Sequence, residues 1–124
     1  MKQVVHSQAA PAPVGPYSQA IICNGMIYTA GQTGVVPSTG RLAEGVQAQT
    51  RQTLENVRAI LEAAGSGLDK VVKTTVFLKN IDDFSAMNEV YASFFTQQPP
   101  ARSTIEVARL PIGALVEIET IAEA

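Results

Sequence analysis

The sequence is poor in the side chains that most often carry metal binding and nucleophilic catalysis. It contains one histidine, His6, and one cysteine, Cys23. Zinc sites generally take three or four His, Cys or carboxylate ligands, and Ser-His or Cys-His catalysis needs a histidine beside the nucleophile. We therefore expect neither a metal site nor such a nucleophile system. A single cysteine cannot form an internal disulfide and is typical of a reducing compartment, which predicts a cytoplasmic protein.

Charge is also scarce and unevenly placed. Only 16% of the 124 residues are charged, against about 25% in an average soluble domain, and residues 3–40 contain no Asp, Glu, Lys or Arg. This stretch is not a membrane span, because a span needs about 20 consecutive apolar residues and prolines and glycines interrupt every run here. The net charge of −2 gives no electrostatic reason to expect nucleic acid or an anionic membrane as a partner. The scarcity instead predicts that part of the surface is covered.

The length predicts a single domain spanning residues 1–124. Near its start, a short strand at Val4-Val5 is followed by two apolar runs, 18–23 and 26–30, which are joined by Asn24-Gly25. That residue pair tolerates the positive φ angles of a type I′ turn, so the two runs predict a β-hairpin. The segment 36–40 is expected to be a turn.

Two helices and three further strands complete the predicted order. Apolar residues spaced by three and four predict a helix over 46–64 that ends at Gly65, and a second helix that Asp82 caps and that ends before Pro99-Pro100. Strands are predicted at 71–78, 102–108 and 115–122. The order β-β-β-α-β-α-β-β predicts an α+β fold, in which a mixed sheet carries both helices on one face. The other face needs a cover, and we predict that the cover is another subunit.

With metal and nucleophile systems excluded, the candidate functional residues are Arg and Glu residues that have apolar neighbours in the sequence. Arg102 opens a strand directly after a Pro-Pro corner, and Glu117 lies in an apolar run with Glu119 on the same strand face. A guanidinium binds a carboxylate in a planar two-pronged pair, and a carboxyl group whose pKa is raised by burial can transfer protons near neutral pH. A solvated strand end and a strand with one polar face explain the same residues equally well. Spacing alone leaves both interpretations open.

Several longer motifs together resemble the RidA family, also called the YjgF family. The resemblance spans nearly the whole chain, and its most specific part is Pro100-Ala-Arg-Ser103, followed by Val107-Ala-Arg-Leu-Pro111 and Val116-Glu-Ile118. The other matching segments are Gly15-Pro-Tyr-Ser-Gln19, Gly31-Gln32, Gln49-Thr50, Asn56-Val57, Glu62-Ala-Ala-Gly65, 71–76, Asn88-Glu-Val-Tyr91 and Phe94-Phe95.

The resemblance implies a chorismate-mutase-like fold of the bacillus type. It also implies a homotrimer with a central barrel of sheets and a cleft between each pair of neighbouring subunits. The implied reaction is the hydrolysis of reactive 2-imino acids and their enamines, namely 2-iminobutanoate and 2-iminopropanoate, to 2-oxo acids and ammonia. No cofactor is implied, because pyridoxal phosphate belongs to the dehydratases that release these imines.

The resemblance further implies roles for individual residues. Arg102 matches the arginine that binds the substrate carboxylate, and Glu117 matches the glutamate that positions the attacking water. Tyr17 matches an aromatic residue that reaches the cleft from the adjoining chain. The other implied substrate contacts are Gly31, Asn88, Ser103 and Thr104. Many members have Cys in place of Thr104 and Ser in place of Ala30, and these differences bear on pocket shape and substrate preference more than on the reaction.

Two other functions stay open as alternatives. A non-catalytic regulator that binds small carboxylates could use the same cleft, but loss of Arg102 or Glu117 would be its signature and both residues are present. An endoribonuclease or translation inhibitor, a role attached to some family members, fits less well. Ribonuclease chemistry often uses histidine and RNA binding uses a basic face, whereas this chain has one terminal histidine and a negative net charge.

Overall fold

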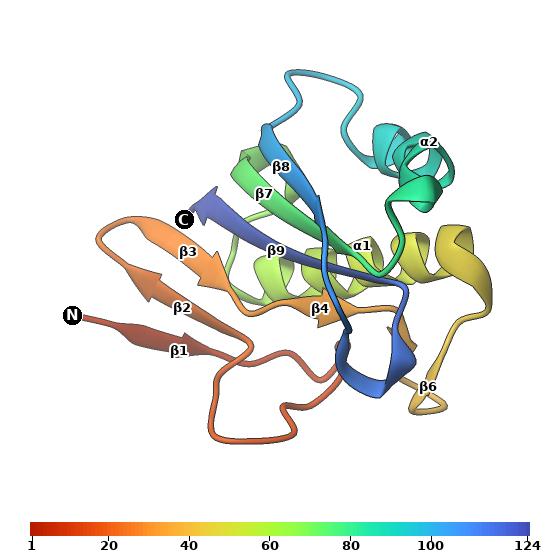
Figure 1. The fold of residues 1–124 in the computed structure, drawn as a ribbon. Coiled ribbons are helices and arrows are strands. Elements are labelled where there is room, and N and C mark those ends of the chain that lie inside the picture. The colour runs from red at the N-terminus through yellow and green to blue at the C-terminus, as the bar shows by residue number, and fades with distance from the viewer.

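A mixed β-sheet forms one layer of the structure and two α-helices form the other. The computed structural model describes all 124 residues, and the helices are α1 (Gly45–Ala63) and α2 (Phe84–Phe94) (Figure 1). The strands of the main sheet are β1 (Gln3–Val5), β2 (Ala20–Cys23), β3 (Met26–Thr29), β4 (Gln32–Thr33), β7 (Val71–Leu78), β8 (Ala101–Glu106) and β9 (Val116–Glu123). A separate two-stranded sheet is formed by β5 (Val35–Val36) and β6 (Arg41–Leu42).

Strand β9 is the centre of the sheet. The strand order is β1-β2-β3-β9-β7-β8, and β4 pairs with a different part of β9 from the part that pairs with β3. All pairs are antiparallel except β7–β8, which is parallel and is connected through α2. Strand β8 is therefore an edge strand that pairs only with β7. This α+β arrangement confirms the predicted mixed sheet with two helices, whereas the trimer and its barrel stay predictions.

The N-terminal hairpin forms as the sequence predicts. Strands β2 and β3 pair in antiparallel register from Ala20 opposite Thr29 to Cys23 opposite Met26. The turn residues Asn24 and Gly25 have φ angles of 52° and 76°. Positive φ at both central positions is what a type I′ turn requires, so the Asn-Gly pair directs the hairpin.

Helix α1 ends where the sequence predicts, at a glycine. Gly65 has a φ angle of 81°, the left-handed conformation that a side chain disfavours. The amide of Ser66 donates to the carbonyl oxygen of Leu61 at 2.9 Å, and the amide of Gly65 donates to that of Glu62 at 3.0 Å. These two bonds satisfy carbonyl groups at the end of the helix, the arrangement of a Schellman motif.

The start of α2 corrects one prediction. Asp82 does not cap this helix, because a single 3₁₀ turn at Ile81–Asp83 precedes it. Asn80 caps that turn instead: its side-chain oxygen accepts a hydrogen bond from the amide of Asp82 at 2.9 Å. Helix α2 itself follows Asp83, whose side chain makes no cap hydrogen bond, so the capping side chain lies two positions before the predicted one.

Several predicted strand ends differ from the structure by one or two residues, and two differences have a clear physical reason. Strand β8 ends at Glu106 and not at Ala108, because its partner β7 ends at Leu78, whose carbonyl accepts the last bond, from the amide of Val107. The segment 36–40 is a turn as predicted, but the two-residue strands β4, β5 and β6 that surround it were not predicted. Runs this short carry no periodic signal.

The core lies between the helices and one face of the sheet. Residues that alternate along β3, β7 and β9 are fully buried there, and they meet the apolar side of α1 and α2. The fully buried apolar residues of these strands and helices are Ile27, Val76, Leu78, Val116, Ile118, Ala122, Leu54, Val57, Ile60, Leu61 and Met87. The alternation on the strands and the three-and-four spacing on the helices are therefore two halves of one core.

The opposite face of the sheet is left open by this chain. Val4, Ile21, Tyr28 and Ile121 occupy successive paired positions on β1, β2, β3 and β9, and thus form an apolar row across that face. Val4 and Tyr28 are 62% and 46% exposed. An exposed row of large apolar side chains marks a surface that associates with another protein surface.

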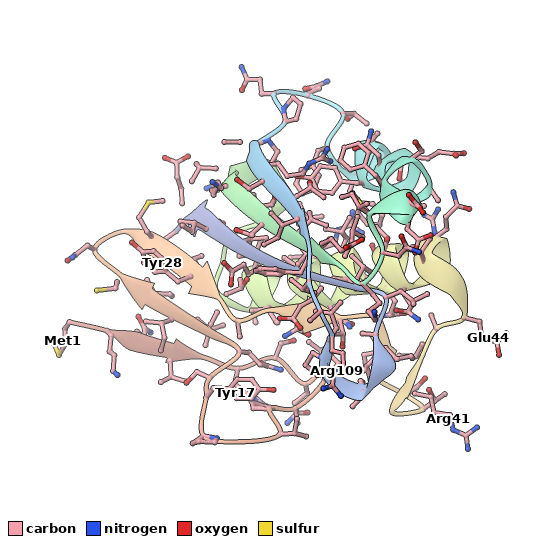
Figure 2. The ribbon with its side chains drawn as sticks, viewed as in Figure 1. Met1, Tyr17, Tyr28, Arg41, Glu44 and Arg109 are labelled. Atoms are coloured by element: carbon pink, nitrogen blue, oxygen red, sulfur yellow. The ribbon has the colours of Figure 1, made fainter.

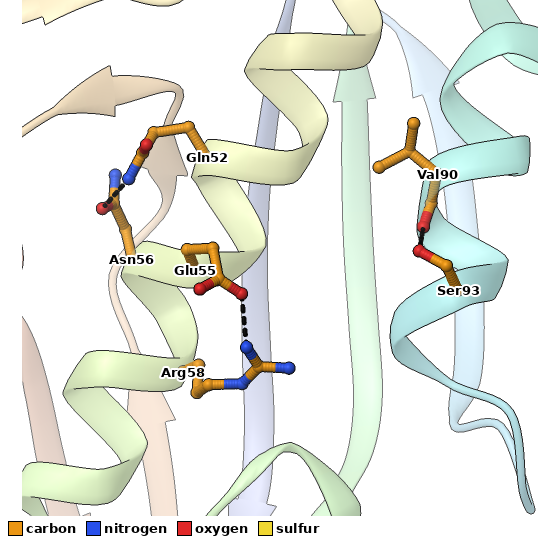
Figure 3. Close-up of polar contacts among 6 residues, drawn as sticks. All are labelled: Gln52, Glu55, Asn56, Arg58, Val90 and Ser93. Carbon is orange, nitrogen blue, oxygen red and sulfur yellow. Dashed lines mark hydrogen bonds and ion pairs between the residues drawn. The ribbon is translucent and has the colours of Figure 1, made fainter.

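Asn56 connects α1 to the segment that carries β4. Its side-chain amide donates to the carbonyl oxygens of Thr33 at 3.1 Å and Val35 at 2.9 Å, while its oxygen accepts from Gln52 at 2.9 Å (Figure 3). Asn56 is 1% exposed, so these bonds replace all of its contacts with water. The segment 33–35 is therefore held against α1, and β4 is held in place beside β9.

Gly34 lies where this segment passes closest to α1. A Cβ atom added to Gly34 would lie 2.6 Å from Cα and 2.7 Å from the carbonyl oxygen of Gln49. Both are backbone atoms of a helix, so they cannot move aside cheaply. Gln49 is itself tied on both sides, since it accepts from the amide of Leu115 at 2.8 Å and donates to the carbonyl of Ala43 at 3.0 Å.

We predict that Gly34→Ala lowers the free energy of unfolding by about 1–3 kcal/mol, the usual cost of overpacking a buried contact. Chemical denaturation monitored by circular dichroism measures this quantity. Gly67→Ala is the matched control, because its added Cβ would meet only Asp69 Oδ1 at 2.8 Å, and that exposed side chain can rotate into solvent. Equal stability of the two variants would contradict the predicted packing.

Candidate active site

Arg102 lies on the edge strand β8 and points towards α2. It pairs in register with Thr74 of β7, a fully buried residue on the helix side of the sheet. Its Nη1 donates a hydrogen bond to Asn88 Oδ1 at 2.7 Å. Its Cζ atom lies 4.6 Å from the ring centroid of Tyr91 and 5.4 Å from that of Phe84. The structure therefore brings together Arg102 and Asn88, two of the predicted site residues.

Arg102 has no acidic partner within the chain. The one ion pair is formed by Arg58 and Glu55 on the exposed side of α1 (Figure 3). A pocket of about 400 Å³ adjoins Arg102, and its lining residues are Asn88, Tyr91, Ala92, Phe95, Pro99, Pro100 and Arg102. A partly buried guanidinium without a counter-ion, beside an open pocket, is suited to a carboxylate that comes from outside the chain.

Glu117 lies on the other face of the sheet. Its neighbours Val116 and Ile118 are fully buried under the helices, so alternation along β9 turns Glu117 towards the open face. It lines a second pocket, of about 410 Å³. The lining residues of this pocket are Pro11, Ala12, Val14, Tyr17, Gly31, Gln32, Thr33, Val35, Pro37, Gly40, Pro111, Ile112 and Glu117. Tyr17, Gly31 and Glu117, three predicted site residues, thus share one cavity.

Gly31 leaves room for the carboxyl group of Glu117. A Cβ atom on Gly31 would lie 2.8 Å from Glu117 Cδ and closer still to its Oε2. The carboxyl group therefore packs directly on the backbone before β4. Because β4 pairs with β9 through Thr33 opposite Glu117, the hydrogen bonding of the sheet sets this approach.

Tyr17 forms another wall of the same pocket. It lies on the long connection between β1 and β2, which is wound tightly here: its amide donates to the carbonyl of Gly15 at 2.9 Å, and its hydroxyl accepts from the amide of Val14 at 3.2 Å (Figure 2). Its side chain is 49% exposed. An aromatic ring held at the rim of a cavity and open to solvent is available to a second molecule.

The environment of Glu117 favours its protonated form. Burial raises the pKa of this carboxyl group, and the negative charge of Glu119, two residues along the same strand face, raises the pKa further. Because folding raises the pKa, Glu117 lowers the stability of the fold once the pH exceeds the pKa of the unfolded chain. A carboxyl group shifted towards neutral pH is suited to accepting and returning a proton.

A single chain does not bring Arg102 and Glu117 into one site. Arg102 is paired with Thr74, whereas Glu117 is paired with Phe77 on the same strand β7. Positions 74 and 77 are three residues apart, so their side chains point to opposite faces of the sheet. The predicted site is therefore divided in two, with Arg102 and Asn88 on the helix side and Tyr17, Gly31 and Glu117 on the open side.

The two remaining predicted contacts are also divided. Ser103 pairs with Thr75 and lies exposed on the open face, where Lys73 Nζ approaches its hydroxyl at 3.5 Å. Thr104 pairs with the buried Val76 on the helix side, and its Oγ1 is buried without a hydrogen-bond partner. Strand β8 thus presents predicted contacts to both faces.

Tyr91 and Phe84 are contacts of Arg102 that sequence reasoning missed. The apolar spacing that predicts the second helix does not separate its core residues from its site residues: Tyr91 is buried, whereas Phe84 is 38% exposed. A signal was present, because Phe84, Asn88 and Tyr91 follow the four-and-three spacing of one helix face.

No group of three or more His, Cys, Asp or Glu side chains is placed to hold a metal ion. Neither helix is long and apolar enough to cross a membrane.

Comparisons with known proteins agree on one family. The family model described as Endoribonuclease L-PSP matches residues 7–124. The 2-iminobutanoate/2-iminopropanoate deaminase of Salmonella typhimurium is 50% identical over 125 residues, with 98% of each chain covered. The crystal structure of the YjgF gene product of E. coli matches with a TM-score of 0.95 and 48% identity, and that of E. coli TdcF with bound serine matches with a TM-score of 0.95 and 42% identity. Each structural match covers 98% of both chains.

We predict that the carboxyl group of Glu117 titrates above the usual range of glutamate and that Glu119→Gln lowers its pKa, because one of the two causes of the shift is removed. Carboxyl ¹³C chemical shifts followed against pH measure this, and Glu117→Gln assigns the signal. Glu123→Gln is the control, since it removes an exposed glutamate farther along the same face of β9. A titration of Glu117 within the usual range of glutamate, or one that Glu119→Gln leaves unchanged, would contradict the prediction.

Proposed function

Because the chain belongs to the Endoribonuclease L-PSP family, which includes RidA and YjgF, we propose that it hydrolyses reactive 2-imino acids to 2-oxo acids and ammonia. The substrates proposed are 2-iminobutanoate and 2-iminopropanoate, which the name of the Salmonella relative specifies at 50% identity over almost the whole chain. The observation that carries the proposal is Arg102, a partly buried cation that no acidic side chain neutralises and that faces a pocket. It is suited to the carboxylate common to these substrates.

The active site is proposed to form between the subunits of a homotrimer. Two observations support this arrangement. Arg102 and Glu117 lie on opposite faces of one sheet, so residues from two chains are needed to surround one substrate. The open face also carries an apolar row that includes Val4 and Tyr28, which packing of three sheets into a central barrel would cover. One chain then supplies Arg102 and Asn88, and its neighbour supplies Glu117, Gly31 and Tyr17.

The proposed reaction needs only binding, one water molecule and proton transfer. Arg102 holds the carboxylate, and the imine nitrogen is protonated, which makes C2 electrophilic. Water adds to C2 as Glu117 accepts a proton from it, so a C–O bond forms and the C=N π electrons move to nitrogen. Glu117 returns the proton to the nitrogen, ammonia leaves, and the hydroxyl loses its proton to give the 2-oxo acid.

This reaction suits a chain that has only one histidine and one cysteine. The imine already hydrolyses in water, so no strong nucleophile, metal or cofactor is required of the protein. The backbone groups of Ser103 and Thr104, which follow Arg102 along β8, would contact the substrate beside Arg102. Because its pKa is raised, Glu117 exchanges its proton closer to neutral pH than an exposed glutamate does.

The description of the family as Endoribonuclease L-PSP favours a second candidate, endoribonuclease activity. The single histidine, His6, lies exposed just after β1 and outside both pockets, and the net charge is −2. Tight RNA binding uses a basic face, which gives this candidate the weaker support. Tight binding of RNA at physiological salt would reverse the order.

We predict that Arg102→Ala abolishes nearly all imine hydrolysis while the oligomer stays intact, because it removes a charge-assisted contact worth about 1.5–3 kcal/mol together with the orientation of the substrate. Semicarbazide trapping of the imine released by a threonine dehydratase measures the activity, and light scattering measures the size. Arg41→Ala is the control, since Arg41 is exposed on β6 (Figure 2). A variant that clears imine like the wild type would remove Arg102 from the site.

We predict that Glu117→Gln lowers kcat more than it weakens binding, and that mixing it with Arg102→Ala restores activity. After joint unfolding and refolding, a cleft between an intact Arg102 and an intact Glu117 arises in about one quarter of the interfaces of randomly mixed trimers. Activity near that fraction of the wild type is therefore expected from two nearly inactive proteins. Absence of recovery in trimers shown to be mixed would place both residues in a site within one chain.

A further inference from the structure

We propose that Tyr91 and Phe84 are positioning residues for Arg102, and that their rings hold the guanidinium in the orientation in which it receives the substrate carboxylate. The role in hydrolysis rests on the proposed function, whereas the role in ordering Arg102 does not. Aromatic rings are assigned the role of ordering Arg102 because no carboxylate forms an ion pair with its guanidinium.

The three contacts of Arg102 come from one face of α2. Phe84, Asn88 and Tyr91 are separated by four and three residues, so their side chains lie side by side on that face. The guanidinium lies 4.6 Å from the centroid of Tyr91 and 5.4 Å from that of Phe84, and it donates to Asn88 at 2.7 Å. Two aromatic rings and one amide therefore restrict a side chain that otherwise has many rotamers.

Tyr91 is itself fixed in place. Its hydroxyl shares a hydrogen bond of 2.8 Å with Thr74 Oγ1, and its ring packs on that of Phe95 with centroids 4.7 Å apart. It is 5% exposed, and burial raises its pKa, which keeps the hydroxyl protonated. Thr74 is also the residue paired with Arg102 across β7 and β8. The strand partner of Arg102 thus anchors the ring on which the guanidinium rests.

Aromatic rings hold a cation without neutralising it. A carboxylate in their place would form an ion pair with Arg102 and compete with the substrate. Asn88 accepts a hydrogen bond from Nη1, and a ring face, unlike a carboxylate, does not neutralise the charge that the other N–H groups share. A planar two-pronged contact with a carboxylate needs those groups to be in a defined plane, so ordering of the guanidinium favours binding.

The other arginine-aromatic contacts of the chain provide a comparison. Arg51 and Arg58 lie 6.0 Å and 5.2 Å from the ring of Phe94, each beside this single ring, and Arg58 is also paired with Glu55. Both belong to exposed or half-exposed parts of α1. Phe94→Leu therefore removes an arginine-aromatic contact of similar distance without touching Arg102, which makes it the matched control.

The test combines a spectroscopic signal with kinetics. In protein labelled with ¹⁵N-arginine, Arg102→Lys assigns the side-chain signals of Arg102. In the wild type these signals are expected to be shifted upfield by the two rings and to show slow rotation of the Nη groups. Tyr91→Leu and Phe84→Leu should each move the signals towards those of exposed arginines, whereas Tyr91→Phe, which keeps the ring, and Phe94→Leu should not.

Activity should follow the same order. We expect Tyr91→Leu to lower kcat/KM for imine hydrolysis about tenfold, mainly through KM, and Tyr91→Phe to stay within about twofold. In an Arg102→Lys background, Tyr91→Leu should cause no further loss, because it acts through the guanidinium. Phe84 is partly exposed, so Phe84→Leu provides the same readout should Tyr91→Leu fail to fold.

The proposal would be overturned if the Arg102 signals stayed unchanged in Tyr91→Leu and Phe84→Leu. It would also be overturned if Tyr91→Leu lowered kcat/KM by the same factor whether position 102 held Arg or Lys. These outcomes are separate from failure of the proposed function. Wild-type imine clearance by Arg102→Ala would reject the assigned reaction site, and the arginine signals would still decide whether the rings order Arg102.

Discussion

The proposed site depends on one constraint: side chains along paired strands alternate between the two faces of the sheet. Arg102 is in register with Thr74 and Glu117 is in register with Phe77, and these two positions of β7 face opposite sides of the sheet. No rotamer choice brings both side chains over one face. The division follows from backbone pairing alone, so it holds for any side chains at these positions. The proposed chemistry therefore needs the proposed trimer.

The two halves of the site are held by different physical means. On the open face the sheet brings the backbone of Gly31 against the carboxyl group of Glu117, and burial with a neighbouring like charge favours its protonated form. On the helix face the charge of Arg102 is kept, because rings and an amide surround it in place of acids. The open-face half raises the pKa of Glu117, and the helix-face half keeps the positive charge of Arg102. Both effects need partial burial, which the two layers provide.

The sequence predicted the elements well where a periodic pattern or a turn residue was present. The hairpin at Asn24-Gly25, the end of α1 at Gly65 and the alternation of β9 all follow from local rules. The motifs also identified the family correctly. The 3₁₀ turn before α2 and the two-residue strands could not be predicted, because they depend on tertiary contacts such as those of Asn56. The separation of Arg102 from Glu117 needed the strand register, which a single sequence does not contain.

The parallel pairing of β7 with β8 leaves the outer edge of β8 without a partner, and this has a consequence for how the protein would fail. A free strand edge offers unpaired N–H and C=O groups to other chains, and Ile105 on this strand is 47% exposed. The opposite edge strand, β1, lies within the charge-free residues 3–40 and carries Val4, which is 62% exposed. Substitutions that weaken the proposed trimer should therefore lead to precipitation and loss of recoverable protein, instead of a well-behaved monomer.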